Sequence, residues 1–210
     1  MNCPHCSASL ALDAAQCRFC GFCATAVRSV LGAEWVRLER LTDASGALSL
    51  KEHRQLETVL DDFERSFPQC FFAVYLGSLP ASLTAGDLGF WLVNHGAFQT
   101  QQIAKRNDYG VALVIDTQHQ SVSLTHGYAL EKHVRNADSM HILNQLGSLL
   151  DRHRYGLAVE QAVKLFGKKL MEAGTRTLPH IPAGTVADLG EMGLQPLRAS
   201  HRSLRVDSKG

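Results

Sequence analysis

The spacing of the cysteines near the N-terminus constrains the fold of this chain more than any other feature of the sequence. Two Cys-x-x-Cys pairs, Cys3 with Cys6 and Cys17 with Cys20, are separated by ten residues. Each pair places two thiolates on one tight turn, and two such turns facing each other make the tetrahedral four-sulfur cage that zinc accepts. A segment this short cannot bury enough apolar surface to fold alone, so metal binding would supply the missing free energy.

Four protein ligands predict a structural metal rather than a catalytic one, because they leave no open coordination position for a water molecule. We therefore expect residues 1–26 to form a zinc ribbon with Zn²⁺ as its structural cofactor and Cys3, Cys6, Cys17 and Cys20 as ligands. Two alternatives remain open. The thiols could be free or redox-active, or Cys23 could replace Cys17 or Cys20 as a ligand.

The sequence carries no pattern that directs the chain into or across a membrane. The N-terminus lacks a basic segment followed by an apolar one, and so does not resemble a secretory signal. The longest apolar runs, residues 70–76 and 111–115, are far shorter than the roughly 20 residues that span a bilayer. Closely spaced thiols in a reducing compartment serve as metal ligands more readily than as disulfides. We expect a cytoplasmic protein without a transmembrane segment.

Helical patterns recur along the rest of the chain. Ser49 and Glu52 have the spacing of a capping box, and the apolar stripe that follows them predicts a helix ending at Pro68. Thr84 and Asp87 repeat the capping spacing and predict a second helix. Two further apolar stripes predict helices over residues 143–150 and 159–170.

Strand patterns lie between these helices. The continuous apolar run of residues 70–76 predicts a central strand that is buried on both faces. Residues 111–116 predict a second buried strand, and the alternation from Ser121 to His126 predicts an antiparallel hairpin with one wetter face. The order of elements predicts an α/β fold with a central sheet and helices packed on it.

The composition along the chain suggests four parts. Residues 1–26 form the zinc ribbon, and residues 27–41 form a connector with near-helical spacing that Gly32 interrupts, so that residues 35–41 could equally be a strand. Small and turn-forming residues at 42–46 mark a boundary before an α/β domain over residues 42–173. Periodicity vanishes from Gly174 onward, so residues 174–210 are expected to be a flexible tail.

Three segments of the larger part carry a family resemblance. They read LTDASGALS at residues 41–49, NDYGVALVI at residues 107–115 and GYALE at residues 127–131. In order and spacing these segments resemble the TPM domain family over residues 41–170. The resemblance implies a TPM-like central β-sheet flanked by helices, preceded here by the small zinc-ribbon module.

The resemblance also supplies candidates for catalysis. Some family members are reported to hydrolyse phosphate esters or to bind divalent ions, which points to the carboxylates at matching positions: Asp108, Glu131 and Asp138. Asp138 stands in for an aspartate that the family places at the start of a helix, and Asp116 is a weaker fourth candidate. Such carboxylates could hold Ca²⁺ or Mg²⁺ beside a phosphate. Asp108 could equally be a turn residue, Glu131 a surface charge and Asp138 a helix cap.

Charge argues against a nucleic-acid partner. The formal net charge is +1, and Asp13 and Arg18 are the only charged side chains in residues 1–26. Such a segment cannot neutralise a run of phosphates. We expect a zinc-binding cytoplasmic TPM-domain protein that acts as a non-catalytic interaction or regulatory module with a protein partner. The alternative is a divalent-metal-dependent phosphatase acting on phosphate monoesters. The sequence does not predict an oligomeric state.

Overall fold

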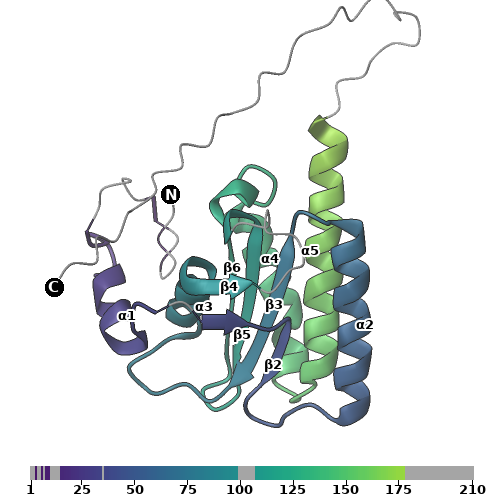
Figure 1. The fold of residues 1–210 in the computed structure, drawn as a ribbon, viewed down its shortest axis with the longest axis horizontal. Helices are drawn as coiled ribbons and strands as arrows, with labels where there is room; N and C mark the ends of the chain where they lie inside the picture. The colour runs from purple at the N-terminus through teal and green to yellow at the C-terminus, as the bar shows by residue number, and fades with distance from the viewer. Residues whose placement is uncertain are drawn as a thin grey trace, which may run out of the picture. The chain divides into compact units, whose positions relative to one another are not determined.

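A computed structural model describes residues 3, 6, 8, 9, 15–34, 36–98 and 107–177 of the chain. These residues form a mixed four-stranded sheet, a short two-stranded sheet and five α-helices (Figure 1). The strands are β1 (Val36–Leu38), β2 (Leu41–Asp43), β3 (Phe71–Gly77), β4 (Gly96–Phe98), β5 (Gly110–Asp116) and β6 (Ser121–His126). The helices are α1 (Ala24–Leu31), α2 (Leu50–Ser66), α3 (Ala85–His95), α4 (Asn136–Leu150) and α5 (Tyr155–Thr177), with 3₁₀ turns η1 (Asn107–Tyr109) and η2 (Tyr128–Leu130).

The larger sheet has the strand order β2-β3-β5-β6. Strands β2, β3 and β5 run parallel, and β6 pairs antiparallel with β5. The prediction of two buried strands and a hairpin is confirmed, because β3 and β5 occupy the centre and every residue of β5 is buried. Strand β6 lies at the edge of the sheet.

Helices cover both faces of this sheet and form two apolar cores. One core joins the sheet to α2, α4 and α5, with Leu60, Leu146 and Phe166 almost fully buried. The other joins it to α1 and α3 through residues such as Val27 and Trp91. The expected α/β class with helices packed on a central sheet is therefore confirmed.

The two predicted capping boxes begin α2 and α3. The Glu52 amide donates to Ser49 Oγ over 3.3 Å, and the Ser49 amide donates to Glu52 Oε2 over 2.9 Å. At α3 the Thr84 amide donates to Asp87 Oδ2 over 2.9 Å, and the Asp87 amide donates to Thr84 Oγ1 over 3.1 Å. These bonds satisfy amides that a helix N-terminus leaves without an intrahelical partner.

The connector contains two elements. Helix α1 begins at Ala24, before the expected connector, and ends at Gly32 with a positive φ of 90°; strand β1 follows, within the residues that the sequence left open as a strand. Strand β1 pairs in parallel with β4, a strand that the sequence did not suggest. The Trp91 indole donates to the Gly32 carbonyl over 2.9 Å and thereby fastens the end of α1 to α3.

Two boundaries also differ from expectation. The segment expected to begin with a turn at Thr42 instead continues the three-residue strand β2, and the turn follows it at Gly46 with φ of 64°. Helix α5 runs to Thr177, three residues past Gly174, where the tail was expected to begin. The rest of the expected tail lies outside the described residues. No helix among the described residues is long and apolar enough to cross a membrane.

Candidate metal centre and binding groove

The four predicted zinc ligands lie together. The sulfur atoms of Cys3, Cys6, Cys17 and Cys20 are all within 4.8 Å of one another. The Cys3 and Cys20 sulfurs are 3.5 Å apart, and the Cys6 and Cys17 sulfurs are 3.6 Å apart. A tetrahedral site with Zn–S bonds of about 2.3 Å separates its sulfurs by about 3.8 Å. The four cysteine sulfurs and the distances between them therefore fit a structural zinc ion.

Backbone hydrogen bonds shape the turn that carries the second cysteine pair. The Cys17 amide donates to the Phe22 carbonyl over 2.8 Å, and the Gly21 amide donates to the Cys17 carbonyl over 2.9 Å. Gly21 has φ of 78°, a left-handed conformation that favours glycine. This turn brings Cys20 back toward Cys17 without a longer loop.

The electrostatics of the cluster favour a cation at its centre. Backbone amides of Cys20 and Phe19 donate to the Cys17 sulfur and lower the pKa of that thiol to about 6. The Phe22 amide also favours the Cys20 thiolate, but desolvation and the sulfurs of its three neighbours outweigh it and raise the pKa of Cys20 to about 12. Neighbouring thiolates repel one another, and a divalent cation offsets that repulsion.

Cys23 occupies a different place in the structure. It is the residue before α1, and its sulfur lies 2.8 Å from Thr25 Oγ1. It is not a member of the four-sulfur group. Its pKa is lowered by the Thr25 hydroxyl and by nearby amides at the start of the helix.

The three carboxylates suggested by family resemblance are placed on separate features. Asp108 is exposed in η1, before β5, and Glu131 follows η2. Asp138 lies in the first turn of α4. Among the described residues, the cysteine cluster is the only group of three or more Cys, His, Asp or Glu side chains close enough to hold a metal ion.

Asp138 makes the contacts of a helix cap. Its carboxylate accepts a hydrogen bond from the Arg135 amide over 3.1 Å and lies 3.4 Å from the Lys169 ammonium. Desolvation raises the pKa of Asp138, but the Arg135 hydrogen bonds and Lys169 lower it by more, so the carboxylate is ionised at neutral pH. These contacts fasten the start of α4 to α5.

Asp116 ends β5 and is 1% exposed. Its Oδ1 accepts from the amides of Gln118 over 3.0 Å, His119 over 3.2 Å and Leu79 over 3.4 Å. Its Oδ2 lies 2.7 Å from His119 Nδ1. Burial raises the pKa of Asp116, and the His119 ring and these amides lower it by more. The carboxylate thus ties the loop after β3 to the turn between β5 and β6.

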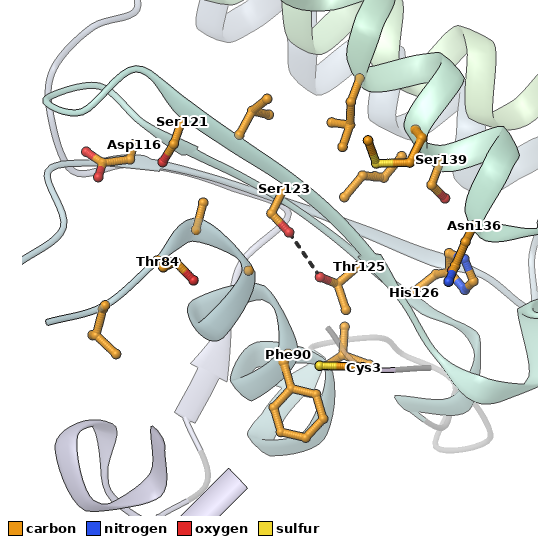
Figure 2. Close-up of a pocket in the computed structure, with 18 of the residues that line it drawn as sticks. Cys3, Thr84, Phe90, Asp116, Ser121, Ser123, Thr125, His126, Asn136 and Ser139 are labelled. Atoms are coloured by element: carbon orange, nitrogen blue, oxygen red, sulfur yellow. Dashed lines mark hydrogen bonds between the residues drawn. The ribbon is translucent and has the colours of Figure 1, made fainter. Parts of the chain in front are cut away.

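A groove of about 640 Å³ runs along β6, between α3 and α4 (Figure 2). On the α3 side it is lined by the hydroxyls of Ser123 and Thr125, whose oxygens are 3.3 Å apart. Helix α3 approaches this strand closely at Gly89, where a Cβ atom would lie 2.6 Å from Thr125 Oγ1. The alternation in residues 121–126 predicted a wetter face here, but not the groove.

One end of the groove is polar. Asn136 and Ser139 of α4 and His126 of β6 line this end (Figure 2). The Ser139 hydroxyl is buried and has no hydrogen-bond partner among the described residues. Desolvation lowers the pKa of His126 and outweighs the opposing effects of the Gly127 carbonyl and the Glu131 charge, so the ring is neutral at pH 7.

Comparison with known proteins identifies the larger part of the chain. The sequence model of the TPM domain family matches residues 41–169, more than half of the chain. The chain belongs to the TPM domain family. The match begins after the cysteine cluster and includes β6 and both helices beside the groove, so every described residue that lines the groove, except Cys3, belongs to the TPM domain.

Solved structures resemble this TPM domain at low sequence identity. The BA42 protein of Bizionia argentinensis has a TM-score of 0.52 at 10% identity, over 62% of this chain and 86% of its own, and supports the fold. An N-terminal domain from P. gingivalis has a TM-score of 0.49 at 21% identity, over 63% of this chain and 82% of its own. The N-terminal domain of the cg2496 protein of Corynebacterium glutamicum has a TM-score of 0.48 at 10% identity, over 77% of this chain and 95% of its own. No curated protein matches the chain significantly.

Proposed function

We propose that this chain is a cytoplasmic, non-catalytic TPM-domain protein that binds a protein partner and carries a structural zinc ion near its N-terminus. The groove along β6 carries the binding function, since it is a concave surface with apolar and polar walls beside an open sheet edge. Two aspartates favour a structural role, because buried Asp116 accepts hydrogen bonds from amides and half-buried Asp138 is engaged by the Arg135 amide and by Lys169.

Zinc supports this function by giving the N-terminal segment its shape. Cys3 and Cys17 are each 2% exposed. Coordination by four thiolates supplies folding free energy that apolar burial cannot supply. Elemental analysis of reduced, chelator-washed protein tests this part, and we expect one zinc per chain.

The binding function is tested by placing a charge in the groove. Met140 lies on α4, lines the groove and is 51% exposed. Met171 lies on α5, outside the groove, and is 58% exposed. Met140→Arg should abolish capture of a partner from lysate, and the matched Met171→Arg variant should capture the same partner as the unaltered chain.

A second comparison separates the zinc segment from the groove. Deleting residues 1–26 should change the efficiency of capture while the TPM domain keeps its thermal unfolding transition. If Met140→Arg and Met171→Arg capture identical proteins in identical yield, the groove does not bind the partner and the proposed function is wrong.

A further inference from the structure

Strand β6 presents to the groove backbone groups that pair with no other strand in the described part of the chain. The Gly127 amide donates to the Gly110 carbonyl over 2.8 Å, which fixes the hydrogen-bonding phase of the β5–β6 pair. In an antiparallel pair the bonded residues alternate, so Ser123 and Thr125 direct their amides and carbonyls toward β5. Val122, Leu124 and His126 therefore direct theirs outward, away from the sheet. No described strand pairs with this edge.

This edge lacks the features that usually prevent pairing. Proteins protect exposed edges with lysine, proline, bulges or a covering element. The strand reads Ser-Val-Ser-Leu-Thr-His, without lysine or proline, and its register with β5 is unbroken from Ser121 to His126. Helices α3 and α4 flank the groove, and Cys3 of the N-terminal segment also lines it. An extended chain beside β6 would lie between the two helices.

The walls of the groove specify which side chains such a chain could carry. Residues of an added strand would alternate between the two walls. The wall formed by α4 offers Met140 and Leu143, which suit apolar side chains. The wall formed by α3 offers Ala85 and Gly86 near its start and Phe90 and Val93 farther along. Because α3 lies close to β6 at Gly89, this side has room for small side chains.

The polar end of the groove adds charge and hydrogen-bonding preferences. Glu131 lines this end, and no lysine or arginine is among the described residues that line the groove. A lysine or arginine of the occupant would complement Glu131. The buried Ser139 hydroxyl lies at the same end and could bond to a polar group of the added chain.

We propose that β6 binds an extended segment of the partner protein as an additional strand of the sheet, by β-strand addition. The segment alternates apolar residues, facing α4, with small residues, facing α3, and carries a lysine or arginine beside Glu131. This inference rests on the proposed binding function and names its site and the chemistry of its ligand.

The test selects peptides of about ten residues, long enough for a typical strand, from a random display library on the immobilised full-length chain. Enriched peptides should alternate apolar and small residues and carry a basic residue near one end. The best one is synthesised and also prepared with N-methyl groups on alternate amides, in both phases. One of the two N-methylated peptides should bind as the parent peptide does. The other should bind at least about tenfold more weakly, because it lacks the amide donors that face β6.

Protein variants probe the same bonds from the other side. Val122→Pro removes an outward amide and leaves the bonds to β5 in place, so it should weaken the parent peptide about tenfold. Val122→Thr keeps the amide and a β-branched side chain, and should bind within about twofold of the unaltered chain. Ser139→Ala should weaken binding about fivefold without lowering the thermal stability of the free protein, because no bond of the free protein is lost.

Two results would overturn the inference: enriched peptides without alternation, or equal binding of both N-methylated phases. The second uses the unaltered chain and so remains decisive if Val122→Pro does not fold. If Met140→Arg still abolishes partner capture in that case, the partner uses the groove in another way and the proposed function stands. If Met140→Arg has no effect either, both are wrong.

Discussion

Replacing Asp116 by asparagine tests whether the carboxylate of this residue has a structural role. The Asp116 carboxylate is buried and accepts from three amides and the His119 ring. Asparagine keeps one oxygen for the amides but loses the negative charge and the acceptor that faces His119. Hydrogen bonds to a charged group contribute about 1.5–3 kcal/mol and neutral ones about 0.5–1.5 kcal/mol. We expect Asp116→Asn to lower the free energy of unfolding by about 2 kcal/mol at pH 7.

The direction of the Asp116 pKa shift determines how the stability difference between the two proteins changes with pH. The pKa of Asp116 in the folded protein is lowered from its ordinary value of 3.8. The charged carboxylate therefore stabilises the fold fully above that ordinary value, and this contribution is lost as the pH falls through the folded pKa. Urea unfolding of both proteins between pH 7 and pH 3 should show a difference that shrinks as the solution becomes acidic.

Asp108→Asn serves as the control for this series. Asp108 is exposed, so its replacement should change stability by less than about 0.5 kcal/mol at every pH. Equal stabilities of Asp116→Asn and the unaltered chain at pH 7, or a difference that grows toward pH 3, would refute the structural role assigned to Asp116.

Three further predictions concern the metal centre, the candidate carboxylates and the core. Cys17→Ser should remove stoichiometric zinc in elemental analysis and leave the main thermal transition of the TPM domain in place, since the cysteine cluster precedes that domain. Purified protein should hydrolyse a generic aryl phosphate no faster than its Asp108→Ala, Glu131→Ala double variant, with or without calcium, magnesium or manganese; a clear loss in the double variant would instead favour a phosphatase. Phe166→Ala should lower the free energy of unfolding by about 4 kcal/mol in urea titrations, because Phe166 is fully buried and its ring packs edge-on against Phe72.

Local patterns in the sequence predicted the parts of this protein that depend on local chemistry. The cysteine spacing predicted a four-sulfur group because each pair needs only one tight turn, and Ser49 and Thr84 predicted two helix starts because a capping box lies within four residues. Continuous apolar runs predicted the central strands because both of their faces are buried.

Features that depend on distant pairing were not visible in the sequence. Strands β1, β2 and β4 have three residues each, too few to show a clear period. The sequence therefore left β1 open between helix and strand and did not predict β4, and these two strands pair with each other. The groove depends on β6 lying at the sheet edge between α3 and α4, which the alternation of residues 121–126 alone does not determine. Whether carboxylates converge is likewise set by tertiary packing, which holds Asp138 against Lys169.

Amide hydrogen exchange along β6, followed by NMR in the full-length chain, tests the open edge most directly. The amides of Ser123 and Thr125 should exchange slowly because they bond to β5, and those of Val122, Leu124 and His126 should exchange much faster because they face the groove. Equally slow exchange at all five amides would mean that the edge is already covered, and would contradict a groove that is open to a partner.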